Sequence, residues 1–140
     1  MSVFVDAFST AFKLIVSLDT SLLEIVWLSI KVSISSLIIA SVFGFPIGAL
    51  LAIKSFRGRA LIITIFNSMM GMPPVVVGLV VYLIVSRSGP LGWLEILYTP
   101  YAMIIAQVIL ILPIIVALST QILEELHKEY EKIFKIFSVP

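Results

Sequence analysis

Long uncharged stretches dominate the pattern of hydrophobic and polar positions along the chain. Three windows lack Asp, Glu, Lys and Arg, at residues 32–53, 60–86 and 96–123. Each exceeds the roughly 18 residues that mark a membrane-spanning helix. With their flanking residues they predict transmembrane helices at 22–53, 60–86 and 100–122. The expected fold class is an all-α membrane protein with loops at 54–59 and 87–99.

Amphipathic segments flank the predicted spans. In residues 1–20, Phe4, Phe8 and Phe12 share one side of a helix and polar residues the other. This pattern predicts a helix lying in the membrane interface, although an apolar face packed on protein explains it equally well. Residues 123–140 show the same two-sided pattern with many more charges, which predicts a cytoplasmic helix. Its charged face is either simply solvated or a platform for a partner.

A stripe of small residues marks the first span. Ser36, Ala40, Gly44, Gly48 and Ala52 recur every four residues, and Gly44 to Gly48 forms a GxxxG pattern. Because lipid gives helices no net hydrophobic drive to associate, close packing at such stripes holds membrane helices together. We therefore expect Ala40, Gly44 and Gly48 to contact another helix.

Local signals set the start and the shape of the same span. Ser21 with Glu24 three residues later fits a capping box, which predicts a helix that begins at Leu22. Pro46 lies inside this helix. It should bend the helix without ending it, because neighbouring groups can satisfy the carbonyl that proline leaves unpaired.

The second span carries two successive prolines, Pro73 and Pro74, at its midpoint. They remove two helical hydrogen bonds and should leave the carbonyls of Met69 and Met70 without partners. Irregular backbone at this depth is tolerated only inside protein or beside a wet cavity. The pair therefore indicates either a transport pathway or a structural kink in a packed bundle.

Composition excludes several classes of function. Apolar residues make up 61% of the 140 residues, charged residues 12%, and the mean hydropathy is +1.21, which argues against a soluble enzyme. A formal net charge of +1 without a clustered basic patch argues against nucleic-acid binding. The chain has no cysteine and one histidine, and the uncharged windows hold no acid or base. We expect no catalytic residue, no metal site and no cofactor.

Basic residues predict the orientation in the membrane. Lys54, Arg57 and Arg59 crowd the first loop, whereas the loop at 87–99 carries one basic and one acidic residue. Further lysines follow the third span. By the positive-inside rule the first loop and the C-terminus are cytoplasmic and the N-terminus lies outside. The expected location is the inner (cytoplasmic) cell membrane, with several passes through it.

Ordered segments of the chain resemble a known family. They are residues 71–79 (GMPPVVVGL), 86–92 (SRSGPLG), 99–100 (TP) and 102–107 (AMIIAQ). Together they resemble the integral membrane permease of ABC importers for oxyanions, in particular the tungstate-type permeases and the related molybdate and sulfate permeases. The resemblance extends from Phe12 to Glu131 and implies part of the fold of binding-protein-dependent transport permeases.

The resemblance also implies partners and site residues. It implies a homodimer of permease subunits, two cytoplasmic ATPase subunits and an extracytoplasmic oxyanion-binding protein that delivers the anion. In the family the broken helix lines the translocation path, which makes it the expected gate. The gate candidates are Asn67, Met70, Met72, Pro73, Pro74, Val75, Val76, Val77 and Gly78.

A cytoplasmic coupling loop for the ATPase is implied after the third span. The family pattern is Glu-Ala-Ala, three variable residues and Gly, and here Glu131 and Phe137 occupy its first and last positions. The alanines and the glycine are replaced. We therefore expect the N-terminal portion of a permease, whether a truncated, split or decayed form.

Two hypotheses of function follow. The first is a permease subunit of an ATP-driven importer of tungstate or a related oxyanion such as molybdate or sulfate. Such a subunit forms the pathway, and no phosphate-binding loop pattern occurs in the chain, so ATP would be hydrolysed by partner subunits. The two central spans hold no basic residue, so selectivity is expected to rest on the binding protein. The alternative is a small three-helix accessory or regulatory subunit without transport activity.

Overall fold

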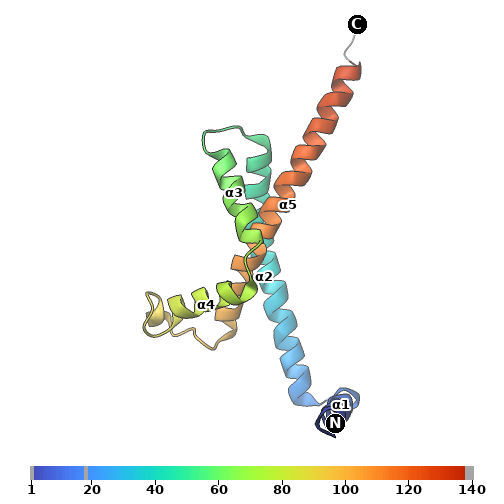
Figure 1. Ribbon diagram of the computed structural model, residues 1–140, viewed down its shortest axis with the longest axis vertical. Helices are drawn as coiled ribbons and strands as arrows, with labels where there is room; N and C mark the ends of the chain where they lie inside the picture. The colour runs from blue at the N-terminus through green and yellow to red at the C-terminus, as the bar shows by residue number, and fades with distance from the viewer. Residues whose placement is uncertain (1, 18, 138–140) are drawn as a thin grey trace.

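The computed structural model describes residues 2–17 and 19–137, and this part of the chain is built from helices and loops (Figure 1). In order, the elements are α1 (Ser2–Val16), α2 (Thr20–Ile53), α3 (Arg59–Met70), α4 (Pro74–Val85), the short 3-10 helix η1 (Gly92–Leu94) and α5 (Pro100–Phe137). Both α2 and α5 are long and apolar enough to cross a membrane, and α3 with α4 counts as a third, broken span. The predicted all-α membrane fold is confirmed.

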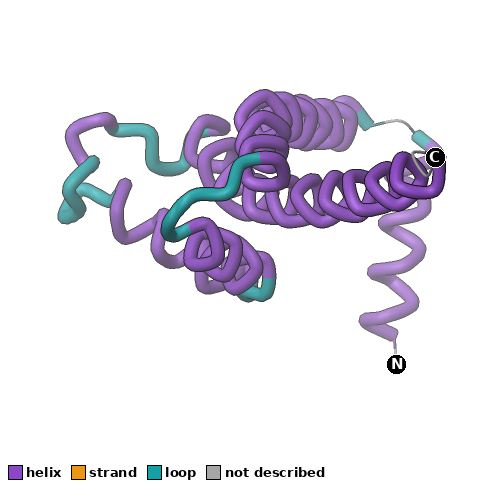
Figure 2. The backbone as a smooth tube through the Cα atoms, turned by 90° about the horizontal axis from the view of Figure 1, so that it is seen from above, coloured by secondary structure: helices purple, strands orange, loops and turns teal. Residues whose placement is uncertain are grey.

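Helix α1 lies across the long axis of α2. It is seen end-on at the foot of α2 in Figure 1 and from the side in Figure 2. Phe4, Phe8 and Phe12 are all exposed, so its apolar face packs on nothing else in the described part of the chain. This direction suits a helix that lies in the plane of the interface while α2 crosses it.

The N-terminus of α2 is capped by Asp19. The backbone N–H of Ser21 donates to Asp19 Oδ1 at 2.9 Å. The pKa of Asp19 lies below its ordinary value. The main cause is a hydrogen bond from the Ser21 side chain, and the second is the hydrogen bond from the Ser21 backbone. The helix therefore begins at Thr20, and the predicted Ser21 cap with a start at Leu22 is wrong. A carboxylate suits this position because it also complements the positive end of the helix dipole.

The central contact of the fold joins α2 to α5, which cross in Figure 1. From α2 the buried residues in the crossing recur every four residues and, at the last step, after three: Val32, Ser36, Ala40, Gly44, Gly48 and Leu51. A Cβ added at Gly44 would lie 2.8 Å from Ile115 Cγ2, and one added at Gly48 would lie 2.6 Å from Ser119 Cβ. The two helices therefore approach so closely that only glycine fits at these positions.

Hydroxyl groups reinforce this crossing. Thr120 Oγ1 is buried, donates to the Val116 carbonyl at 2.8 Å and lies 3.3 Å from the carbonyl of Gly48. Ser36 Oγ donates to the Val32 carbonyl at 2.7 Å. Each hydroxyl is satisfied by the backbone of its own helix while it touches or approaches the other helix, so polar groups enter the contact without an unpaired donor.

The second predicted span consists of two helices, and the chain bends by 101° between them. Gly71, Met72 and Pro73 separate α3 from α4, and Pro74 is the first residue of α4, where proline is favoured. The Met72 N–H donates to the Met69 carbonyl at 3.0 Å. The expectation of an unpaired Met69 carbonyl is therefore wrong, because a turn supplies the donor that the prolines remove.

Helix α4 leaves this break at a steep angle to α5 and packs on the first turns of α5 (Figure 1). Val77, Val81 and Val85 are its buried residues. They form a small core with Ile96, Leu97, Ala106 and Leu110. Since these valines recur every four residues, one face of α4 is fixed against α5 and the opposite face stays open.

Helix α5 is continuous from Pro100 to Phe137. The predicted span at 100–122 and the predicted cytoplasmic helix thus form one rod, and residues 138–140 of the latter lie outside the described part. No helix breaker separates the two sections, and Glu, Leu and Lys after Gln121 are strong helix formers. Similarly, α2 continues through Pro46 as one helix of 34 residues, about 51 Å long at 1.5 Å per residue.

The close crossing predicts a specific cost for a single methyl group. Gly48→Ala places Cβ against Ser119 Cβ and 3.1 Å from the Val116 carbonyl, neither of which is a flexible side-chain end. Overpacking of this kind costs about 1–3 kcal/mol. We expect Gly48→Ala to lower the midpoint of unfolding in mixed micelles, followed by circular dichroism.

The matched control is Gly78→Ala on α4, where an added Cβ meets nothing within 4 Å. This substitution should be neutral or stabilising by up to about 1 kcal/mol, because alanine favours helix over glycine. Equal midpoints for Gly48→Ala and the unmodified chain would contradict the close approach of α2 and α5.

Candidate functional site

The gate candidates lie on both sides of the break between α3 and α4. Asn67 and Met70 are exposed on the last turns of α3, and Met72 and Pro73 are exposed in the break. The rest are on the first turns of α4: Pro74, Val75, Val76, Val77 and Gly78. The structure thus brings the candidates together around one bend.

Val77 differs from the other candidates in its surroundings. Its side chain is only 5% exposed and belongs to the core between α4 and α5, whereas Val75 is 81% exposed. The open face of α4 continues from Val75 through Leu79 to Leu83, all exposed. A path along α4 would therefore contact the exposed face of the helix. Val77 would not line such a path, because its side chain packs on the opposite side, against α5.

The remaining sequence candidates lie elsewhere. Ala40, Gly44 and Gly48 sit in the crossing with α5, so the partner of the small-residue stripe is a helix of the same chain. Glu131 is exposed on the distal half of α5, with an oxygen 3.7 Å from His127 Nε2. Phe137 ends α5, and its side chain lies outside the described ones.

An ion pair ties three helices together at the start of α3. Arg59 Nη2 pairs with Glu124 Oε1 on α5, and Arg59 Nε donates to the Leu51 carbonyl near the end of α2 at 2.5 Å. The two side chains are 31% and 30% exposed. The sequence analysis identified Arg59 only as one of the basic residues of the first loop. Its partner could not be found because the two residues are 65 positions apart.

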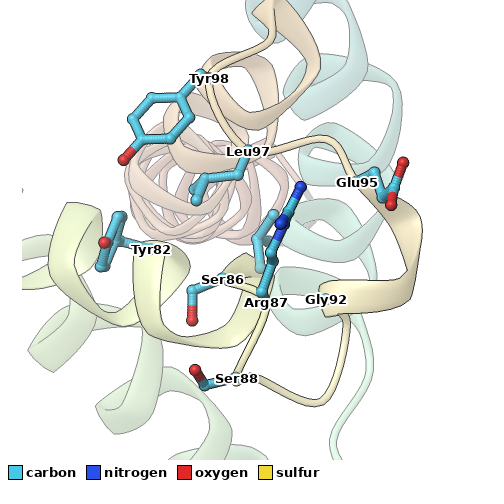
Figure 3. Close-up of a pocket in the computed structure, with 9 residues that line it drawn as sticks. Tyr82, Ser86, Arg87, Ser88, Gly92, Glu95, Leu97 and Tyr98 are labelled. Carbon is cyan, nitrogen blue, oxygen red and sulfur yellow. The ribbon is translucent and has the colours of Figure 1, made fainter.

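A pocket of about 540 Å³ lies at the far end of α4, between its last turn and the segment that leads into α5 (Figure 3). It is lined by Tyr82, Val85, Ser86, Arg87, Ser88, Gly92, Glu95, Leu97 and Tyr98. The sequence analysis assigned residues 87–99 to an outer loop and used residues 86–92 for the family resemblance, but it predicted no pocket there. The signal that could have marked it is Arg87, the single Lys or Arg between residues 60 and 127.

Tight turns shape the wall of this pocket. The Gly89 N–H donates to the Ser86 carbonyl at 2.7 Å, and the Leu91 N–H to the Ile84 carbonyl at 3.0 Å. A Cβ at Gly89 would collide with the carbonyls of Leu83 and Ile84, and one at Gly92 would lie 2.5 Å from the Ser86 carbonyl. Both positions require glycine because backbone packs directly on backbone. The loop is therefore held in one shape.

One polar group inside the helical part is unpaired. Gln107 Oε1 on α5 is buried and has no hydrogen-bond partner among residues 2–17 and 19–137. Its neighbour Ala106 packs on the valine core of α4. A buried acceptor without a donor is costly in a membrane, so water or further protein would stabilise it.

Comparison with known proteins identifies the class. Residues 44–140 match the family described as binding-protein-dependent transport system inner membrane component. The chain belongs to this family of membrane transport permeases. No solved structure matches the chain.

Named relatives give the match more detail. The chain is 38% identical to the tungstate uptake system permease protein TupB of Peptoclostridium acidaminophilum, over 96% of its own length and 59% of the relative's. It is 39% identical to a probable anion ABC transporter permease protein of Haloferax volcanii, over 79% and 47% of the two lengths. The sulfate transport system permease protein CysW of Escherichia coli strain K12 is 32% identical, over 66% and 33%. The chain thus spans roughly half the length of the first two.

The ion pair at the start of α3 predicts a measurable coupling. In a double-mutant cycle of Arg59→Gln and Glu124→Gln, we expect the two side chains to couple by about 0.5–1 kcal/mol, because the pair is partly exposed. Arg59→Gln alone should cost more than Glu124→Gln, since it also loses the bond to the Leu51 carbonyl. The measurement is unfolding in mixed micelles.

Glu125→Gln serves as the control. Glu125 neighbours Glu124 on α5, is exposed, and has no ion pair within the described helices. Its substitution should leave stability unchanged and should not couple to Arg59. Strictly additive effects of Arg59→Gln and Glu124→Gln would show that the pair contributes nothing.

Proposed function

We propose that this chain belongs to the permease subunit of an ATP-driven importer of tungstate or a related oxyanion such as molybdate or sulfate. The observation that carries the proposal is the 38% identity to a tungstate uptake permease along 96% of the chain. The other relatives support the same class of cargo, since their names specify anion and sulfate transport. The subunit itself is non-catalytic in this proposal, and ATP is hydrolysed by partner subunits.

The break between α3 and α4 forms the gate in this proposal. Three features support it. The helices meet at 101°, the residues from Met72 to Val76 are exposed, and the backbone there is irregular within an apolar segment. Irregular backbone in a membrane requires protein or water around it. The unpaired side-chain oxygen of Gln107 lies on α5, against which α4 packs. This oxygen also requires protein or water around it.

The proposed assembly follows from the family. A second permease subunit covers the open face of α4, an extracytoplasmic binding protein delivers the oxyanion, and ATPase subunits bind on the cytoplasmic side. The loop between α2 and α3 and the distal half of α5 point toward the same end of the molecule in Figure 1. With the N-terminus outside, this shared end is cytoplasmic and carries Lys54, Arg57 and the lysines of α5, in line with the positive-inside rule. Glu131 and Phe137 are the coupling candidates there.

Uptake by intact cells tests the proposed function. The full natural product that carries this chain is expressed with its ATPase and binding-protein partners in cells that lack tungstate uptake. We expect accumulation of tungstate that depends on a functional ATPase, measured by mass spectrometry of washed cells. If tungstate, molybdate and sulfate all stay at the level of cells without the permease, the proposal is wrong.

The gate assignment is tested by restoring a straight helix. Pro73→Ala with Pro74→Ala removes two helix-breaking residues, each of which disfavours a helix interior by about 3 kcal/mol. The expected result is a continuous α3–α4 helix and uptake reduced by roughly tenfold or more, equivalent to about 1.4 kcal/mol in the transport barrier. Assembly with the partners should persist and is checked by co-purification.

Pro46→Ala is the matched control, because Pro46 lies in a helix that is already continuous. It should leave uptake near that of the unmodified permease. Normal uptake by the double variant would reduce the proline pair to a structural kink and remove the gate from α3–α4.

A further inference from the structure

The pocket at the end of α4 carries a further inference, which rests on the proposed function and gives it a specific site. We propose that this pocket binds a tetrahedral oxyanion, with the guanidinium of Arg87 as its anchor. The argument combines the charge of the pocket, its hydrogen-bond donors and the rigidity of its wall.

Arg87 is available to a ligand. It is exposed and makes no ion pair in the part of the chain described here. Arg59, at the other end of the α3–α4 pair, is by contrast committed to Glu124 and the Leu51 carbonyl. A guanidinium presents five N–H donors in a planar fork that matches two oxygens of one anion. Arg87 therefore offers a free site for oxyanion oxygens.

Neutral hydroxyls line other parts of the same pocket. Tyr82, Ser88 and Tyr98 line the pocket, and their hydroxyls donate to no acceptor in the described structure. The Ser86 hydroxyl donates to the Leu83 carbonyl at 3.3 Å and so is left as an acceptor. Figure 3 shows Arg87 rising between Leu97 and Glu95, with both tyrosine rings on the other side of Leu97. Free hydroxyl donors let a pocket bind an anion without adding further charge.

The space suits a small hydrated anion. A volume of about 540 Å³ far exceeds the share of about 30 Å³ that one water takes in the liquid. An oxyanion can therefore occupy the pocket with several waters that bridge it to the hydroxyls. Glu95 is the single acid in the lining, and its charge opposes the ligand. The predicted affinity is accordingly moderate, which suits a site that must release its cargo.

The wall of the pocket is fixed and locally strained. Besides the glycine turns, Glu95 and Tyr98 adopt positive φ angles of 48° and 64°. Non-glycine residues in this region cost of order 1 kcal/mol or more each, and they persist where the surrounding structure enforces them. Tyr98 is also 89% exposed, so burial of its ring does not explain the strain. A strained tyrosine in the same pocket lining as an unpaired arginine fits a preorganised binding site.

A fluorescence titration tests the proposal directly. Trp93 in η1 lies in the loop that walls the pocket, and Trp27 on α2 is the other tryptophan of the chain. In a Trp27→Phe background, the full chain in phosphatidylcholine nanodiscs is titrated with sodium tungstate and sodium sulfate, with sodium chloride to match ionic strength. We expect a saturable change in Trp93 emission with the oxyanions and none with chloride.

Variants that change the charge of the pocket should shift the oxyanion affinity in predictable directions. Arg87→Gln should weaken oxyanion binding by at least about tenfold, the lower range for loss of a hydrogen bond that involves a charged group. Arg87→Lys should bind with intermediate strength, because it keeps the charge and loses the fork. Glu95→Gln should bind more tightly, an outcome that damage to the fold cannot produce. Arg57→Gln, an exposed arginine in the loop between α2 and α3, should bind as the unmodified chain does.

The outcomes separate this site from the proposed function. No saturable response, or equal affinity of Arg87→Gln and the unmodified chain, overturns the site. If cellular uptake is then still present, the proposed function stands without it. If the chain binds oxyanions through Arg87 but the complete system accumulates none, the site stands and the importer function falls.

Discussion

The crossing of α2 and α5 is the contact on which the rest of the structure depends. It brings two backbones together at Gly44 and Gly48, where a single added methyl would collide with α5. In a bilayer this closeness matters more than apolar area, because lipid solvates an apolar side chain as well as a neighbouring helix does. The other elements are placed by it: Arg59 fixes the start of α3 to both helices, and the valine face of α4 packs on α5.

This arrangement leaves α4 with two unequal faces. Val77, Val81 and Val85 are buried against α5, while Val75, Leu79 and Leu83 face outward. Because α4 is packed on one side and turned by 101° from α3, a movement about the break would have to open this core or carry the packed part of α5 with it. The glycine and prolines between α3 and α4 restrict that movement to a short segment. In the proposed permease, this is where opening and closing would occur.

The sequence predicted the features that arise from local periodicity. Uncharged windows located the long helices, and the four-residue spacing from Ser36 to Gly48 located the face that packs on α5. Features that depend on distant residues could not be predicted. The bend at Pro73 depends on a turn and on the packing of α4, and the Arg59–Glu124 pair joins residues 65 positions apart. The pocket forms only where the fold brings the end of α4 beside residues 92–98. At the start of α2 the predicted Ser21 cap was wrong, because the carboxylate of Asp19, two residues earlier, accepts the hydrogen bond from the Ser21 N–H.

The two arginines that bound the α3–α4 pair make the two ends of the proposed path unlike. Arg59 is neutralised by Glu124 at one end, whereas Arg87 keeps its charge available at the other. Between them, residues 60–86 carry no charge at all. An oxyanion would thus be attracted at the Arg87 end and find no second cation along α4 that could trap it. Conduction needs binding strong enough to admit an ion and weak enough to release it. In the proposed importer, a single open arginine opposed by Glu95 would meet both conditions, and ATP hydrolysis in the proposed partner subunits would drive the net movement.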